Sequence, residues 1–289
     1  MKINIKRILV PTDFSEISFG ALDYAAFIAK KFNAKITLLH VYELFDQVGN
    51  QQVMSYRELL EKGIHDKMQQ LTTANSNFWG VKIDTKIVEG KSYKEIDKAA
   101  QEVGADLVVM GTHGSTGLKS LEKYVLGTNA FRTVHESSCP VITIRKGMKK
   151  PVCSNILLPM SVDKETGQKV DYAIEWAKTF GAKVHVLSVT EMIDEFVADI
   201  QKLNDLVTET EAKLRKEKID FTSKTFRNST LSKTIFSHAK KMQCDLIFIM
   251  SKNDSGIGEF LVPAADRKII GESEVPVFSL RPDRNTKKK

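Results

Sequence analysis

The tetrapeptide Ile8-Leu9-Val10-Pro11 returns as Ile156-Leu157-Leu158-Pro159, 148 residues further along the chain. Three further matches follow in the same order, and they are DYA at 23–25 and 171–173, ADL at 105–107 against CDL at 244–246, and PVITIR at 140–145 against PVFSLR at 276–281. A conserved order of matches over the whole length indicates that one domain has been duplicated, with net shortening in the second copy.

The length of 289 residues suits two domains of ordinary size, each large enough for its own core. We expect the first domain at 1–147 and the second at 154–283, with residues 284–289 as a basic tail. The stretch between the domains contains Lys149, Lys150 and Pro151 and shows no apolar period, which is typical of a short linker.

Within each copy, short β-rich runs alternate with helical periodicity. In the first copy we expect strands at 8–10, 36–41, 81–87, 107–110 and 141–144, with helices around 22–29, 56–71, 92–103 and 124–135. Strands one and four are continuously apolar, which is typical of a parallel sheet covered by helices on both faces. Each half is therefore predicted to be a doubly wound, Rossmann-like α/β domain with five parallel strands.

The composition is that of a globular protein, with 42% apolar and 27% charged residues. No apolar stretch approaches the roughly 20 residues that cross a bilayer, and residues 1–7 lack the features of a secretory signal. We therefore expect a cytoplasmic protein without a membrane partner.

The formal charge of +7 is concentrated at the end of the chain, since residues 281–289 contribute more than half of it. A basic tail on a nearly balanced body does not indicate a specific nucleic-acid binder. Cys139, Cys153 and Cys244 are odd in number and far apart, so they predict neither a disulfide framework nor a zinc site. The six histidines also lack metal-ligand spacing, and no metal fingerprint is found.

The candidate ligand site lies after strands, because doubly wound sheets bind ligands outside the carboxyl ends of their strands. Pro11-Thr12-Asp13 follows the first strand, and Gly111-Thr112-His113-Gly114-Ser115-Thr116-Gly117 follows the fourth. Gly127-Thr128-Asn129 stands at the expected start of a helix, where glycines and exposed N–H groups suit phosphate. Asp13 could accept hydrogen bonds from ribose hydroxyls, or it could cap the following helix.

These segments together resemble the universal stress protein family, twice over nearly the whole chain. The resemblance is carried by RILVPTDFSE at 7–16, LLHVYE at 38–43, ADLVVMGTHG at 105–114, GTNAF at 127–131 and SSCPVITIR at 137–145. It implies the strand order 3-2-1-4-5. From the family's ATP-binding members it further implies Asp13 at the ribose, the Val41 main chain at adenine, and Gly111, Gly114, Gly127 and Thr128 around the phosphates. His113 is a candidate phosphate neighbour.

One spacing departs from the family pattern G-x2-G-x9-G-[ST]. Twelve residues separate Gly114 from Gly127, whereas nine separate Gly117 from Gly127. We prefer Gly111 and Gly114 as the motif, with three extra residues near 118–123, because the end of the strand fixes the register. The alternative register begins at Gly114 and uses Gly117.

The second copy keeps the nine-residue spacing and loses these residue types. Gly111 corresponds to Met250, Gly114 to Asn253, Gly127 to Pro263, Thr128 to Ala264 and Asp13 to Ser161. Proline has no N–H to donate, and the larger side chains stand where a backbone must approach a ligand. We therefore expect one ATP per chain, bound in the first domain, with Mg²⁺ only as its counter-ion.

The sequence favours a nucleotide-dependent regulatory module of the stress response over an enzyme. The P-loop and dinucleotide-binding fingerprints are absent, and no residue can be assigned as a general base or nucleophile. A nucleotide-independent interaction scaffold and a slow ATPase remain as alternatives. For partners, we expect an adenine nucleotide and an intramolecular pseudo-dimer through the edge strands 141–144 and 277–280, with further homo-oligomers possible.

Overall fold

A computed structural model describes residues 3–43, 50–112, 128–148, 151–160, 166–190, 197–227, 229–251 and 264–282. In the first half the elements are β1 (Arg7–Pro11), α1 (Glu16–Phe32), β2 (Lys35–Tyr42), α2 (Asn50–Trp79), β3 (Ile83–Glu89), α3 (Ser92–Val103), β4 (Leu107–Gly111), α4 (Thr128–Glu136) and β5 (Val141–Ile144). The predicted alternation of strands and helices is confirmed. Residues 124–127, expected to open α4, lie outside the described residues.

The second half repeats the pattern. Its elements are β6 (Asn155–Met160), α5 (Thr166–Phe180), β7 (Lys183–Val189), α6 (Val197–Lys216), β8 (Phe221–Phe226), α7 (Leu231–Lys241), β9 (Leu246–Met250), α8 (Ala264–Glu272) and β10 (Val277–Leu280). Each element of one half has its counterpart in the other, as the repeat predicted.

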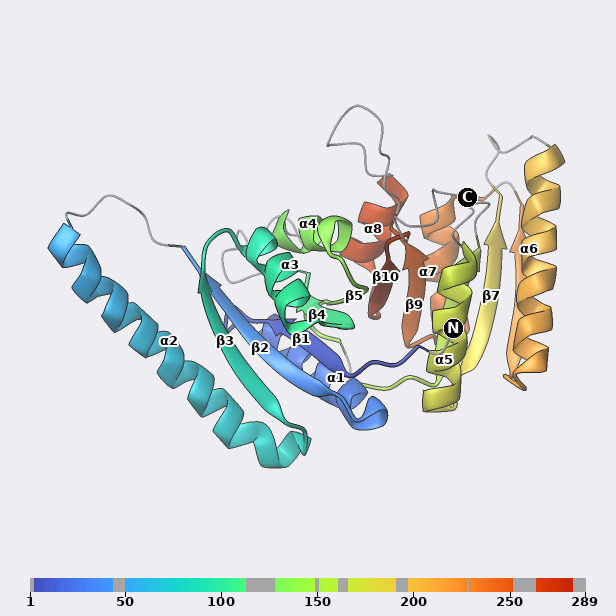
Figure 1. The fold of residues 1–289 in the computed structure, drawn as a ribbon. Coiled ribbons are helices and arrows are strands. Elements are labelled where there is room, and N and C mark those ends of the chain that lie inside the picture. The colour runs from blue at the N-terminus through green and yellow to red at the C-terminus, as the bar shows by residue number, and fades with distance from the viewer. Residues whose placement is uncertain are drawn as a thin grey trace.

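All the strands form one ten-stranded sheet with the order β3-β2-β1-β4-β5-β10-β9-β6-β7-β8. Each half contributes a parallel sheet of order 3-2-1-4-5, which confirms the order that the family resemblance implied. The halves join where β5 and β10 pair antiparallel, with Ile142 opposite Phe278. The expected pairing of the two edge strands within one chain is therefore confirmed. Figure 1 shows the result as a continuous sheet, with α2 at one end and α6 at the other.

Helices cover both faces of this sheet, and each covering layer draws on both halves. One core lies beneath α1, α2, α5 and α6, and the other beneath α3, α4, α7 and α8. Across the join, Phe27 of α1 stacks on Phe180 of α5 with ring centroids 5.1 Å apart, and Phe32 packs on Trp176 at 4.9 Å. Aromatic pairs bury large areas, so these contacts bind the two halves into one body.

Two arginines tie the edges of the join in a pseudo-symmetric way. Arg145 follows β5 and donates from Nη1 to the carbonyl of Glu272 at the end of α8 (2.9 Å). Arg281 follows β10 and donates from Nη1 to the carbonyl of Ser137, just after α4 (3.3 Å). Each arginine thereby binds an end carbonyl of the other half's last helix, where a cation is also favoured by the helix dipole.

Candidate functional site

Doubly wound sheets bind ligands in a crevice at the point where the strand order reverses, and in the first half that point lies between β1 and β4. Their pairing ends at Leu9 opposite Val108. Thr12 N donates to Leu39 O of β2 (2.8 Å), so the main-chain groups of Thr12 face β2. Because main-chain groups alternate in direction along a strand, those of Leu9 and Pro11 face β4. Pro11 is the next residue that faces β4, and it has no N–H to continue the ladder. The sequence therefore ends this pairing at the point where the strand order changes direction.

Main-chain groups face this crevice from both sides. Tyr42 O accepts a hydrogen bond from Gly90 N (2.9 Å), so the main chain of Val41 faces the opposite way, past the end of β1. Thr112 N donates to Ile144 O of β5 (2.8 Å), so the main chain of Gly111 also faces β1. The structure thus places Pro11, Val41 and Gly111 at one edge of the sheet, with their main chains facing the switch point.

The loop after β1 is held by its own hydrogen bonds. Thr12 is buried, and its hydroxyl lies 3.0 Å from that of Ser18 and accepts from Phe14 N (3.1 Å). Phe14 has a φ of 63°, a left-handed conformation that a bulky residue adopts only under such constraint. The loop is therefore shaped before any ligand arrives.

Asp13 does not cap α1, which answers the question that its sequence position left open. The N-cap is Ser15, whose hydroxyl oxygen accepts from Ser18 N (3.3 Å). Asp13 instead accepts from Ser15, at 3.1 Å from N and 2.6 Å from the hydroxyl, both through Oδ1. These two bonds fix the orientation of its carboxylate. Asp13 stands half-buried at the mouth of the crevice.

His40 supports the same loop, a role that no sequence pattern indicates. Its Nδ1 lies 2.8 Å from Thr12 O, and its ring packs on Phe14 with centroids 4.6 Å apart. Burial lowers the pKa of His40, more than the bond to Thr12 raises it. Because a carbonyl can only accept, Nδ1 carries the proton in this bond. Lys67 of α2 places its ammonium 5.4 Å from the Phe14 ring and adds a cation beside the loop.

The other predicted site residues fall partly outside the description. His113, Gly114, Gly117 and Gly127 lie outside the described residues, so the choice between the two glycine registers stays a prediction. Thr128 is the first residue of α4, and Asn129 is exposed in its first turn. The expected helix N-terminus after the glycine segment is thereby present.

The corresponding edge of the second half carries different chemistry. Met250 ends β9 where Gly111 ends β4. Lys169, at the position of Ala21, is 2% exposed and its ammonium donates to Pro159 O, the counterpart of Pro11 O. The alignment of the two repeats, which sets Lys169 against Ala21, contains this signal.

A residue of the first half also reaches this second edge. Ser251, the counterpart of Thr112, has its hydroxyl 2.7 Å from Nδ1 of His135 in α4. Burial, with Arg281 and Arg267 nearby, lowers the pKa of His135 to about 4. The ring also packs on Phe131, over which Arg267 of α8 lies at 4.4 Å. Helix α4 of the first half therefore contacts the residue that directly follows β9 in the second half.

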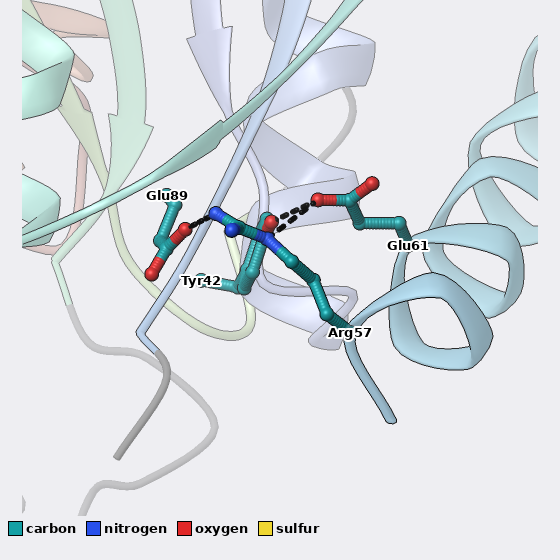
Figure 2. Close-up of polar contacts among 4 residues, drawn as sticks. All are labelled: Tyr42, Arg57, Glu61 and Glu89. Atoms are coloured by element: carbon teal, nitrogen blue, oxygen red, sulfur yellow. Dashed lines mark hydrogen bonds and ion pairs between the residues drawn. The ribbon is translucent and has the colours of Figure 1, made fainter. Parts of the chain in front are cut away.

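A groove of about 460 Å³ lies between α2 and the ends of β2 and β3. Figure 2 shows its polar wall, where the Tyr42 hydroxyl donates to Glu61 and Arg57 bridges Glu61 and Glu89. Burial raises the pKa of Tyr42, and Glu61 raises it further. The helical spacing of Arg57 and Glu61 is readable from the sequence, whereas their meeting with Tyr42 depends on the fold.

The structure also bears on metal binding and on membrane insertion. Within the described ranges, no three His, Cys, Asp or Glu side chains gather as a metal would need. In the same part of the chain, no helix is both long enough and apolar enough to cross a membrane.

Comparisons with known proteins agree on one family. The chain is 36% identical to the universal stress protein MJ0531 of Methanocaldococcus jannaschii over 148 residues, which cover 50% of this chain and 85% of that protein. It is similar in fold to a universal stress protein from Archaeoglobus fulgidus, with a TM-score of 0.77, 22% identity, and coverage of 96% of this chain and 98% of that one. The sequence pattern of the universal stress protein family matches residues 4–145 and again residues 154–281. The chain therefore belongs to the universal stress protein family, as a tandem of two family domains.

Proposed function

We propose that the first domain binds one ATP and that the protein acts as a nucleotide-dependent regulatory module of the cytoplasmic stress response. The main observation in support is the crevice above Pro11, which the main chains of Val41 and Gly111 face from opposite sides. Backbone groups at a switch point of the sheet suit an adenine base and its phosphates.

The ligand would follow the crevice from β2 to α4. Adenine would bond to the Val41 main chain, and Asp13, oriented by Ser15, would accept from the ribose hydroxyls. The phosphates would lie between Gly111 and the N-terminus of α4, where N–H groups and the helix dipole favour negative charge. Gly114 or Gly117, Gly127 and His113 would complete this segment, and Mg²⁺ would accompany the phosphates as a counter-ion.

The second domain would hold no ATP. Met250 places a side chain at the position of Gly111, and the Lys169 ammonium is already bonded to Pro159 O. The hydroxyl of Ser251 is bonded to His135. These contacts support a structural or regulatory role for that half.

Calorimetry of the full chain with ATP tests the stoichiometry and the site together. We expect one nucleotide per chain, and Asp13→Ala should weaken binding by a factor of about 10 to 150, because a charge-assisted hydrogen bond contributes about 1.5–3 kcal/mol. Gly114→Val should weaken it at least as much. The matched controls are Ser161→Ala and Asn253→Val in the second copy, which should leave affinity unchanged. Two comparable sites, or equal effects of site and control variants, would contradict the assignment.

Turnover separates the binding module from the slow ATPase. Around the crevice, His40 has a lowered pKa and an Nδ1 that is bonded to Thr12 O, and Asp13 is bonded to Ser15. Neither is arranged to activate a water molecule, so hydrolysis should be far slower than the roughly 10 per second of a typical enzyme. Mass spectrometry of the natively purified protein tests the remaining alternative. If the purified protein contains no nucleotide and binds none in titration, it is a nucleotide-independent scaffold.

A further inference from the structure

A second cavity, of about 310 Å³, lies where the two halves meet, away from the proposed ATP crevice. Its wall from the first half includes Asp106 and Ser138, at the amino-terminal edge of that half's strands. Its wall from the second half includes Gln168 and Tyr172 of α5 and Arg281, which follows β10. We name it the seam cavity. Junctions between domains are preferred places for small-molecule sites, and this volume is in the range that such sites have.

Opposite charges face the seam cavity from the two halves. Asp106 Oδ2 accepts from Lys6 N (2.8 Å) and Arg7 N (2.9 Å), and these two bonds fix its position. Arg281 is held by its bond to Ser137 O (3.3 Å), and a guanidinium has five N–H donors in a rigid fork. Residues of opposite charge, Asp106 from the first half and Arg281 from the second, therefore line the cavity.

The remaining walls are a mixture of apolar and uncharged polar groups. Ile5 and Leu280 line it and are each 1% exposed, and the Tyr172 ring packs on Phe278 with centroids 5.5 Å apart. Ser138 and Gln168 add a hydroxyl and an amide. An occupant with an ammonium, a carboxylate and a small apolar part would match these walls.

The duplication provides an internal comparison for this cavity. On the pseudo-equivalent side, Asp245 also accepts two backbone bonds, from Ser154 N (2.7 Å) and Asn155 N (2.9 Å). There, however, Tyr24 is only 4% exposed, and burial raises its pKa well above the ordinary value. Cys153 and Met148, in the segment that joins the halves, pack against the same core. The Asp and Arg framework therefore stabilises both sides, but the tyrosine stays accessible only on the side of the seam cavity.

We propose that the seam cavity binds a small zwitterion of the α-amino-acid class. Its ammonium faces Asp106, its carboxylate faces Arg281, and its side chain lies against Tyr172 and Leu280. This site is independent of the ATP site, since none of the residues that line it belongs to the crevice above Pro11.

The test is titration of the full chain, without nucleotide, with glycine, L-leucine and L-glutamine. At least one of them should bind saturably. The amino acid that binds most tightly is then compared with two analogues, one without the carboxylate and one without the ammonium. It should bind at least about tenfold more tightly than either analogue, because each charge pair contributes on this scale. If none of the three amino acids binds, or if an analogue binds as well as its parent, the proposal is wrong.

Variants then locate the bound molecule. Arg281→Gln and Asp106→Asn should each weaken binding about tenfold or more. Arg145→Gln and Asp245→Asn remove the equivalent framework contacts on the other side and should change affinity less than about twofold. Circular dichroism checks that all four variants fold. Equal losses in the variants of both sides would show that the affinity depends on the join rather than on the seam cavity, and would overturn the proposal.

Discussion

The carboxyl edges of the two halves share the same strand arrangement but carry different residues. In the first half, a proline ends the β1 ladder and the main chains of Val41 and Gly111 face the opening. In the second half, Pro159 occupies the same place, but a buried lysine binds its carbonyl and Met250 replaces the glycine. Duplication therefore preserved the part of the sequence that builds the sheet. It did not preserve the part that would receive a ligand, which shows that the two requirements are carried by separate residues.

The largest effect is expected when the first half receives the residue of the second half at the end of its fourth strand. Gly111→Met places a side chain where the backbone is proposed to approach the phosphates, so ATP affinity should fall about 100-fold or more. Calorimetry measures the ATP affinity. Gly111→Ala, which adds a smaller side chain, should lower the affinity less than Gly111→Met does. If Gly111→Met bound ATP as the wild type does, the phosphates could not lie against this residue.

The link between the two edges can be broken at His135. Its folded-state pKa of about 4 lies below the ordinary 6.5, so the neutral ring is the form that the fold favours. The resulting stability is complete above about pH 6.5 and is lost as the pH falls towards 4. Allowing for the ring's partial exposure, the loss should be on the order of 2 kcal/mol.

Denaturant unfolding between pH 7.5 and pH 4 checks this expectation. His135→Gln keeps a hydrogen-bonding group but cannot titrate, so its stability should fall less over that interval than that of the wild type. His65→Gln, on the exposed side of α2, is the control and should follow the wild type. Identical pH profiles for the wild type and His135→Gln would contradict the buried, neutral assignment.

The smallest effect on ATP binding is expected from the reverse substitution in the second half. Met250→Gly restores the glycine of the second half but leaves Lys169 bonded to Pro159 O and Ser251 bonded to His135. The stoichiometry should stay at one ATP per chain, with affinity changed less than about twofold. A second site created by this one substitution would show that Met250 alone had closed the second crevice.

The sequence predicted the fold where its signals report packing. The repeat, the alternation of elements and the pairing of the two edge strands are confirmed, because they depend on buried apolar residues such as Ile8, Ile142 and Phe278. The strand order came from the family resemblance rather than from periodicity. Helix α2 was expected at 56–71 and runs from Asn50 to Trp79. Its apolar period includes Ile64 and Met68, which are buried, and it predicted the middle of the helix better than its ends.

The candidate site was predictable only in part. Pro11, Val41 and Gly111 lie at the same edge of the sheet, because parallel strands bring their carboxyl ends together, and their role in binding stays a prediction. The support from His40 was not predictable, since its bond to Thr12 O depends on the conformation of a loop with a left-handed Phe14. Nor was the bond between His135 and Ser251, which joins residues of different domains.

The antiparallel pairing of β5 with β10 has a consequence for mass action. Two separate chains that shared such an edge would exchange between monomer and dimer, and their stability would depend on protein concentration. Here both edges belong to one chain, so dilution cannot separate them, and each strand meets the other at a fixed effective concentration. The two halves therefore always occur in a one-to-one ratio. That ratio allowed their carboxyl edges to diverge, because every first half is certain to meet a second half rather than another copy of itself.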